Sequence, residues 1–175
     1  MERSNRNARL FWPVAAGFLL TDIISKWWAV NSLAPAHTRH EVLGDFITFT
    51  LLYNPGAAFG LHLGDWSRWI FTALTIGAVI ILVRMYQATG DGDTPKLTSL
   101  GMILGGACGN LIDRLRSSQG VVDFIDVGIG QTRWPTFNVA DIGVSCGALL
   151  LAWVLWREDR AAARALSTGD PSSAR

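Results

Sequence analysis

The stretch GNLIDRLRSSQGVVDFIDVGIGQTRWPTFNVAD, residues 109–141, places four aspartates between strongly apolar flanks. They are Asp113, Asp123, Asp126 and Asp141. A carboxylate inside or beside a membrane-spanning segment is costly, and it is usually kept because it takes part in chemistry or in ion movement. We therefore interpret the rest of the chain as a scaffold that holds some of these carboxylates at one depth of a lipid bilayer.

The composition is that of a small polytopic membrane protein. Half of the 175 residues are hydrophobic, 17% are charged, and the mean hydropathy is +0.28. These values are unusual for a soluble domain, and the length suits one domain rather than two. The net charge of +1, without a concentrated basic stripe, predicts no nucleic-acid partner.

Apolar segments long enough to cross a bilayer recur along the chain. A helix needs about 20 residues to cross the hydrocarbon core. The first segment continues past Asp22 without a convincing cleavage site, so we interpret it as a retained span rather than a signal peptide. The sequence thus predicts an α-helical polytopic membrane protein with four transmembrane helices. The four candidate spans cover residues 10–30, 67–86, 97–116 and 136–156.

The distribution of basic residues predicts the orientation. Cytoplasmic loops and termini are enriched in Lys and Arg, and three basic clusters fit this rule if both termini are cytoplasmic. Residues 1–160 then form a single four-span membrane domain, and the polar residues 161–175 form a disordered cytoplasmic tail. Some arginines fall on the outer side, so the bias is imperfect. The clusters are Arg3, Arg6 and Arg9, then Arg84 and Lys96, then Arg157, Arg160 and Arg164.

The segment between the first two spans predicts a small outer sheet at about residues 41–64. Residues 45–53, DFITFTLLY, are rich in β-branched and aromatic side chains and predict a strand. The Asn-Pro-Gly sequence at 54–56 is a turn signal, and residues 57–63 predict a returning strand. The apolar character of both faces indicates that this sheet rests on the membrane or encloses an apolar ligand.

Polar residues from three spans fall in the outer half of the predicted bilayer. Asp22 and Lys26 are four residues apart, so they share a helix face and can form an ion pair. The inner halves of the spans stay apolar. This convergence predicts one interfacial site. The spacing Asn-x-x-Asp occurs at the outer ends of the last two spans, in Asn110 with Asp113 and in Asn138 with Asp141.

Paired carboxylates are the functional groups that this set offers. Two carboxylates held close together share a proton, and such a pair supplies a general base and a general acid that can direct water at a peptide carbonyl. His37, His40 and His62 all lie in the outer segment, which argues against a Ser-His or Cys-His arrangement. Without an HExxH or CxxC motif we expect no metal and no cofactor. The residues alone leave open an acid-base dyad, an ion or proton relay, and purely structural ion pairs.

The main rival from another class is a proton- or ion-coupled carrier. Asp22, Asp113 and Asp141 would then line a path across the membrane. The inner halves of the spans lack ionisable residues to complete that path, and the chain shows no inverted repeat of the transporter kind. A structural membrane subunit would leave the cost of so many intramembrane charges unexplained.

Five ordered motifs resemble those of lipoprotein signal peptidase, also called signal peptidase II, a family of bacterial inner-membrane aspartic proteases. The resemblance covers roughly residues 10–156. Any one motif is weak, and their common order makes the match specific. They are TDxxSKW at 21–27, YNPGAAFG at 53–60, GGACGNLIDRL at 105–115, VVDFID at 121–126 and FNVADIGV at 137–144.

The resemblance implies a fold, a location and an activity. The expected fold has four transmembrane helices, a periplasmic β-cradle and a short periplasmic amphipathic helix. The expected location is the bacterial inner membrane, with cytoplasmic termini and an active site toward the periplasm. Such an enzyme removes signal peptides from prolipoproteins on the amino side of a diacylglyceryl-modified cysteine. It acts in contact with membrane lipid, as a monomer, and is expected to bind globomycin-type peptide inhibitors.

The resemblance also selects site residues. The catalytic pair falls on Asp123 and Asp141, a choice that sequence spacing alone would not make. For Asp113 we expect pairing with Arg114 or another nearby cation, and for Asp126 a position exposed in a loop. The remaining residues are expected to support the dyad or contact the substrate: Asp22, Lys26, Asn54, Asn110, Asp113, Arg114 and Asn138.

Overall fold

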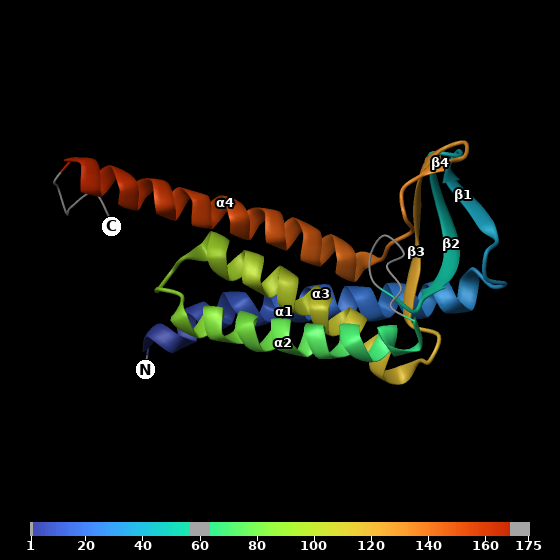
Figure 1. Ribbon diagram of the computed structural model, residues 1–175, viewed down its shortest axis with the longest axis horizontal. Coiled ribbons are helices and arrows are strands. Elements are labelled where there is room, and N and C mark those ends of the chain that lie inside the picture. The colour runs from blue at the N-terminus through green and yellow to red at the C-terminus, as the bar shows by residue number, and fades with distance from the viewer. Residues whose placement is uncertain (1, 57–63, 169–175) are drawn as a thin grey trace.

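The computed structural model describes residues 2–56 and 64–168. Four long helices lie side by side, and a small sheet stands at one end of them, with its strands across the direction of the helices (Figure 1). The helix α1 begins and the helix α4 ends at the opposite end of the bundle (Figure 1). The helices are α1 Glu2–Ser32, α2 Ser67–Ala88, α3 Thr94–Arg116 and α4 Val139–Thr168.

The helix α3 is the centre of the bundle, because it packs against each of the other three helices. Its glycines permit this close approach. A Cβ atom on Gly105 would overlap the carbonyl oxygen of Ala15 in α1, and one on Gly106 would overlap that of Ala140 in α4. Small residues at such positions let helix backbones approach each other inside membranes. At these two positions α3 therefore packs directly against the backbones of α1 and α4.

Three of the helices are long and apolar enough to cross a membrane: Arg6–Ser32 within α1, Ser67–Ala88, and Val139–Arg164 within α4. Among the described helices α3 is the long one that falls outside this group. Its neighbours cover much of its surface, so its residues are selected for small size and polar contacts rather than for contact with lipid. The prediction of four spans is therefore supported for three of them, and the crossing by α3 stays a prediction.

The sheet is antiparallel, with the strand order β1-β2-β3-β4. The strand predicted at 45–53 is confirmed as β2, whereas the returning strand predicted at 57–63 lies outside the described residues. The partner of β2 on the side away from β1 is β3, a segment that we had placed in a loop. Residues on both faces of this strand are buried, so the sequence VVDFID lacks the alternation of apolar and polar residues that predicts a half-exposed strand. The bounds are β1 Arg39–Leu43, β2 Ile47–Asn54, β3 Val121–Ile129 and β4 Thr132–Arg133.

An apolar cluster attaches the sheet to the C-terminal end of α1. Leu51 of β2 and Phe124 of β3 are buried together with Ala29 of α1 and with Leu33, the residue that follows α1. The rings of Phe124 and its neighbours meet edge to face, the geometry that aromatic pairs prefer. A separate cluster between α1 and α3, around Phe11, Leu100 and Leu104, forms the core of the opposite half. The sheet is thus fixed to the bundle beside the ends of α3 and α4.

Two sequence expectations concern the end of α4 and the residues before α2. Residues 161–168, which we expected to be disordered, continue α4 as a helix. Their alanine, arginine and leucine residues are strong helix formers, and this propensity outweighed their polar character. Before α2, the described residues form one 3-10 turn, Gly64–Trp66. The short amphipathic helix implied by the resemblance stays a prediction.

Candidate active site

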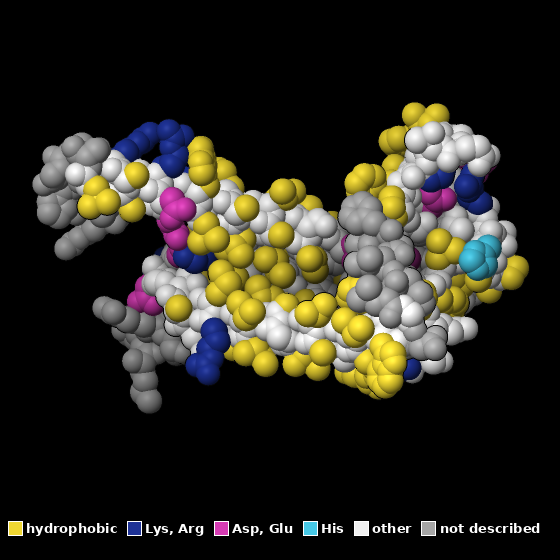
Figure 2. Space-filling view, viewed as in Figure 1, with side chains coloured by type: hydrophobic (Ala, Val, Ile, Leu, Met, Phe, Trp, Pro, Cys, Tyr) yellow, Lys and Arg dark blue, Asp and Glu magenta, His cyan; other side chains and the backbone are white. Residues whose placement is uncertain are grey.

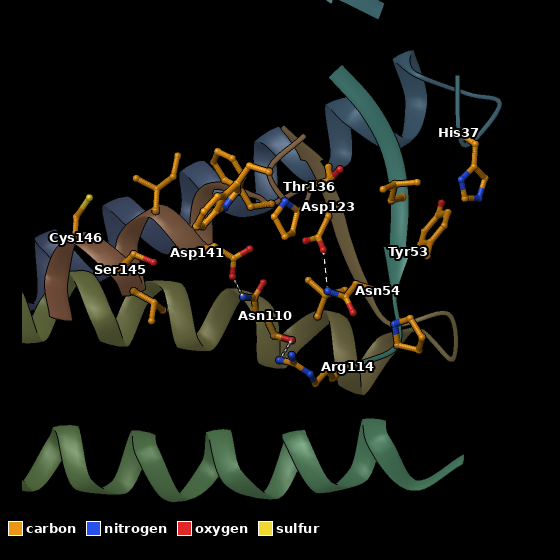
Figure 3. A pocket seen from close by; sticks show the side chains of 18 residues that line it. His37, Tyr53, Asn54, Asn110, Arg114, Asp123, Thr136, Asp141, Ser145 and Cys146 are labelled. Atoms are coloured by element: carbon orange, nitrogen blue, oxygen red, sulfur yellow. Dashed lines mark hydrogen bonds between the residues drawn. The ribbon is translucent and has the colours of Figure 1, made fainter. Parts of the chain in front are cut away.

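Elements far apart in the sequence bring the predicted polar residues to one place between the sheet and the helix ends beside it. Figure 3 shows Asn54, Asp123, Asn110, Arg114 and Asp141 of this set. The sheet contributes one residue from the end of β2 and one from β3. The helices α1 and α3 contribute two and three residues, and α4 contributes one residue just before its start and one in its first turn. The residues are Asn54 and Asp123, then Asp22 and Lys26, then Asn110, Asp113 and Arg114, then Asn138 and Asp141.

Asp123 is a buried carboxylate with two amide donors. Its side chain accepts hydrogen bonds from Nδ2 of Asn138 at 2.6 Å and from Nδ2 of Asn54 at 3.0 Å. Burial raises the pKa of Asp123 from 3.8 to about 7, and the negative charge of Asp141 adds to the rise. The hydrogen bonds from Asn54 and Asn138 and the positive charge of Lys26 lower it. Near neutral pH this carboxyl group can therefore both hold and release a proton.

Asp141 lies in the first turn of α4. One of its carboxylate oxygens accepts a hydrogen bond from Nδ2 of Asn110 at 2.9 Å, and the other accepts one from the backbone N–H of Asn138 at 3.2 Å. In return, the backbone N–H of Asp141 donates to Oδ1 of Asn138 at 3.0 Å. This reciprocal cap satisfies two backbone donors at the helix start and places a negative charge at the positive end of the helix dipole. The helix start thus fixes the position of Asp141.

Asn138 connects the two carboxylates. Its side chain is completely buried and donates to both Asp123 and Oδ1 of Asn110, while its backbone N–H donates to Asp141. Asn110 in turn donates to Asp141. A continuous set of hydrogen bonds through two asparagines therefore joins Asp123 of the sheet to Asp141 of the helix bundle.

A buried lysine orients Asn110 from the other side. Nζ of Lys26 lies 2.8 Å from carboxylate oxygens of Asp22 and Asp113 and donates to Oδ1 of Asn110 at 2.8 Å. Three acceptors match the three protons of the ammonium group. Because Oδ1 of Asn110 receives this bond, its Nδ2 is left to face Asp141. The predicted pair of Asp22 with Lys26 is confirmed.

The other predicted partners are found in part. Asp113 pairs with a nearby cation as expected, and that cation is Lys26 rather than its sequence neighbour Arg114. Arg114 instead donates from its guanidinium to the carbonyl oxygens of Asn110 and Gly56. Consecutive helix positions point about 100° apart, so neighbours on α3 meet different elements. Asp22 also accepts a hydrogen bond from the backbone N–H of Ala140 at 2.8 Å, which ties α1 to the start of α4.

A pocket of about 740 Å³ opens beside the two carboxylates. Asp123 and Asp141 both line it, and Figure 3 shows them on neighbouring elements with Asn110 and Asn54 close to them. Polar side chains line the part near the sheet, and the first turns of α4 line the other part down to Ser145 and Cys146. Pockets that are mostly apolar with a few convergent polar groups are typical of ligand sites.

Comparison with known proteins identifies the family. The family model described as signal peptidase (SPase) II matches residues 14–157. The chain belongs to this family. A lipoprotein signal peptidase of Burkholderia mallei (strain SAVP1) is 43% identical over 129 residues, which cover 73% of this chain and 76% of the relative. One of Xanthomonas campestris pv. campestris (strain 8004) is 37% identical over 153 residues, covering 86% and 90%.

Two solved structures resemble this chain over most of its length. One is described as a bacterial membrane enzyme structure obtained by the in meso method at 2.3 Å resolution. It superposes with a TM-score of 0.75 at 28% identity and covers 83% of this chain and 87% of that chain. Another, at 1.9 Å resolution, superposes with a TM-score of 0.70 at 29% identity. Membership of the signal peptidase II family makes the chain a membrane peptidase that removes signal peptides from prolipoproteins.

The position of Asp126 differs from the expectation from the sequence. We expected it to be exposed in a loop, but it lies in β3 and is only 5% exposed. Its carboxylate pairs with Nε of Arg133 at 2.9 Å and accepts a hydrogen bond from Thr48 at 3.1 Å. Because the sequence does not predict β3, its pairing with β2, which brings Thr48 opposite Asp126, could not be inferred. The sequence analysis also gave no role to Arg133.

The described part of the chain offers no obvious metal centre. Within residues 2–56 and 64–168, no group of three or more His, Cys, Asp or Glu side chains is placed to hold a metal ion. The two cysteines there, Cys108 and Cys146, are free thiols on different helices.

Proposed function

We propose that this chain is an aspartic endopeptidase that removes signal peptides from prolipoproteins. It cuts on the amino side of the diacylglyceryl-modified cysteine, with Asp123 and Asp141 as the catalytic pair. One observation carries the assignment of the pair. In a chain of the signal peptidase II family, the buried Asp123 and the half-buried Asp141 line the same pocket. Hydrogen bonds through Asn138 and Asn110 join the two carboxylates.

The environments of the two carboxylates suggest their roles. The pKa of Asp123, raised to about 7 mainly by burial, favours Asp123 as the group that starts with the proton. Asp141 then acts as the general base and takes a proton from a water molecule. The resulting hydroxide attacks the scissile carbonyl carbon while Asp123 gives its proton to the carbonyl oxygen, which yields a neutral tetrahedral intermediate.

Collapse of this intermediate restores the enzyme. The protonated Asp141 gives its proton to the leaving amide nitrogen, and the C–N bond breaks. A hydroxyl group of the intermediate returns its proton to Asp123 as the new carboxyl group forms. One water molecule is consumed, and the two aspartates end in their starting protonation states. Asn110 and Asn138 hold both carboxylates in place throughout, because each carboxylate accepts a hydrogen bond from at least one of them.

The location of the site supports a topology for the enzyme. We place four spans in the bacterial inner membrane, with both termini cytoplasmic and the pocket toward the periplasm. The start of α1 and the end of α4 lie at the end of the bundle opposite the sheet (Figure 1), and the polar cluster lies beside the sheet. The apolar lower part of the pocket lies along α4 toward Cys146, where acyl chains in the outer leaflet can reach it. We expect a monomer that globomycin-type peptides inhibit by occupying this pocket.

The position of the polar cluster at one end of the bundle argues against the alternative that this chain is an ion- or proton-coupled carrier. Its ion pairs and hydrogen bonds gather at the outer ends of α1, α3 and α4, and the opposite half of the bundle packs through the apolar cluster around Phe11 and Leu100. A relay across the membrane would need ionisable groups through that apolar half. A site at one interface suits a peptidase whose substrate is a lipid-anchored peptide.

Cleavage of a diacylglyceryl-modified prolipoprotein by the purified protein in detergent tests this proposal. An unmodified precursor, the variant Asp141→Asn and the matched control Asp159→Asn complete the experiment. Asp159 is an exposed carboxylate on the cytoplasmic part of α4. We expect cleavage of the lipidated form alone, lost in Asp141→Asn and kept in the control. A folded wild type that cleaves neither precursor would favour the carrier, and cleavage by Asp141→Asn would overturn the assigned pair.

A further inference from the structure

The segment just before Asn138 forms one wall of the pocket. All four of its residues, 134–137, line the cavity, and we call them the wall segment. Trp134 is 59% exposed, so a ligand in the pocket can reach it. The backbone is attached to β3 at both ends of the segment, through Trp134 N–H to Val127 O at 2.8 Å and Phe137 N–H to Ile125 O at 3.0 Å. The wall segment is therefore held against β3 at both ends, and its first residue follows Arg133 directly in the chain.

Arg133 precedes the wall segment directly and binds three other parts of the sheet. Its Nε lies 2.9 Å from a carboxylate oxygen of Asp126 in β3. One terminal nitrogen donates to Oγ1 of Thr48 in β2 at 3.0 Å and to the carbonyl oxygen of Asp126 at 3.2 Å. The other donates to the side chain and the carbonyl oxygen of Asp45 in the turn between β1 and β2. The planar guanidinium thus fixes the orientation of Arg133 from several directions at once.

Asp126 is the buried member of this network. It accepts hydrogen bonds from Thr48 at 3.1 Å and Thr50 at 3.4 Å in addition to its pair with Arg133. Arg39 is a weaker partner, because its Nε lies 3.6 Å away and its side chain is 42% exposed. Moving Arg133 would leave a buried carboxylate without its close cation, which is strongly unfavourable. Asp126 therefore keeps Arg133, and with it the start of the wall segment, in one place.

We propose that Arg133, held by Asp126, is a positioning residue that sets the wall segment for substrate binding through Trp134. This inference rests on the proposed function. Arg133 does not line the pocket, whereas its neighbour Trp134 does. The ring of Pro135, the next residue, fixes its own φ angle, which restricts the backbone of the wall segment. The contact with substrate is made away from the two reacting carboxylates. Binding that is equal in the ground and transition states changes KM and leaves kcat almost unchanged.

The variant Arg133→Lys tests the positioning role while keeping the charge. A lysine ammonium neutralises Asp126 but has no planar fork to reach Thr48 and Asp45 together. With a fluorogenic peptide that carries a diacylglyceryl-modified cysteine, we expect KM to rise about tenfold and kcat to stay within about twofold. Arg39→Lys is the matched control from the same sheet, and its KM should stay within about twofold because its contacts are long and half-exposed.

A double-mutant cycle separates positioning from a general loss of stability. Trp134→Ala should raise KM by itself. If Arg133 acts through Trp134, Arg133→Lys should add less than about twofold in the Trp134→Ala background, whereas independent effects would multiply. The pH dependence of kcat should be the same in all four proteins. Multiplying effects on KM, or an unchanged KM in Arg133→Lys, would overturn the inference.

A second variant and the activity of the wild type cover the remaining outcomes. If Arg133→Lys does not fold, as judged by its melting temperature in detergent, Thr48→Val replaces it. That variant removes two hydrogen bonds, one to Arg133 and one to Asp126, without changing charge. The bond to Arg133 is the one that bears on the wall segment, and its loss predicts a KM rise of about threefold. An unchanged KM in folded Thr48→Val contradicts the inference. A wild type that cleaves nothing overturns the proposed function together with this inference, whereas cleavage with unaffected variants overturns the inference alone.

Discussion

Asp123 and Asp126 lie three residues apart on β3, both nearly fully buried, yet their partners differ in kind. The neutral amides of Asn54 and Asn138 bind Asp123, and the charged guanidinium of Arg133 binds Asp126. Asp123 also lines the pocket, whereas Asp126 lies within the sheet, away from the residues that line it. Figure 2 shows basic and acidic side chains gathered together on the sheet, apart from the apolar surface of the bundle.

The difference explains why one strand can carry both a chemical and a structural carboxylate. An arginine partner makes a fixed ion pair, and such a pair is suited to holding segments together. Neutral amide donors fix the position of a carboxylate without committing it to one charge. Burial and a second carboxylate then bring its pKa to about 7, the range where proton transfer is efficient. The choice of hydrogen-bond partner, rather than depth of burial, separates the two roles.

The largest expected effect comes from Asp123→Asn. General acid-base groups contribute about 10²–10⁴-fold to rate, so we expect kcat to fall by about that factor at pH 7. The protein should still fold and insert, because an amide fits in the same space. Single-turnover cleavage of the lipidated precursor measures the loss, and circular dichroism checks the fold. A kcat within tenfold of wild type would remove Asp123 from the catalytic pair.

Asp126→Asn should act on stability instead. It leaves the half-buried Arg133 with only the more exposed Asp45 as a carboxylate partner, and breaking a buried pair on one side costs about 3–5 kcal/mol, which is the upper bound here. Denaturant or thermal unfolding in detergent measures this effect. Asp45→Asn is the control, because Asp45 also pairs with Arg133 but is 48% exposed, so about 1 kcal/mol or less is expected. Equal losses in the two variants would contradict the central place of Asp126.

The raised pKa of Asp123 predicts a pH dependence with a definite sign. If Asp123 donates a proton, kcat/KM should fall as the pH rises through about 7. The folded state also binds this proton more strongly than the unfolded chain, whose value is near 3.8. Its contribution to stability is therefore complete below about pH 4 and is lost as the pH rises toward 7. This loss should be absent in Asp123→Asn, and a wild-type rate that rises steadily to pH 9 would exclude Asp123 as the acid.

Removal of a neutral donor should give the smallest effect. Asn54→Ala deletes a hydrogen bond that lowers the pKa of Asp123, so the alkaline fall in kcat/KM should move to higher pH. The loss of one hydrogen bond of about 1 kcal/mol predicts a decrease of about fivefold at the optimum. A pH-rate profile of wild type and variant measures both. Movement of the fall to lower pH would show that Asn54 stabilises the protonated form instead.

The sequence predicted much of the helical part because its signals are local. Apolar runs of sufficient length marked the helices, and each observed helix overlaps a predicted span. The pair of Asp22 with Lys26 followed from their four-residue spacing on one helix. Five motifs in order indicated the family. The end of α4 was misjudged because composition was weighed above helix propensity.

The sequence could not rank the carboxylates by residue reasoning alone. Asp113 is adjacent to Arg114, yet it pairs with Lys26, which lies on a different helix. Asp126 was placed in a loop because its strand has buried residues on both faces and so lacks the alternation that marks a half-exposed strand. The family resemblance, rather than spacing, selected Asp123. The wall segment received no role, because nothing local distinguishes it from an ordinary turn.

The sequence by itself thus determined the membrane class, the approximate helices, the local ion pair and the family. Only the tertiary structure decided which carboxylates share a pocket and which donors meet them. Asn54 and Asp123 are 69 residues apart, and Thr48 and Asp126 are 78 apart. Helix periodicity and hydropathy report neighbours within a few turns, whereas these contacts depend on strand pairing and on the close approach of α1, α3 and α4 at their glycines.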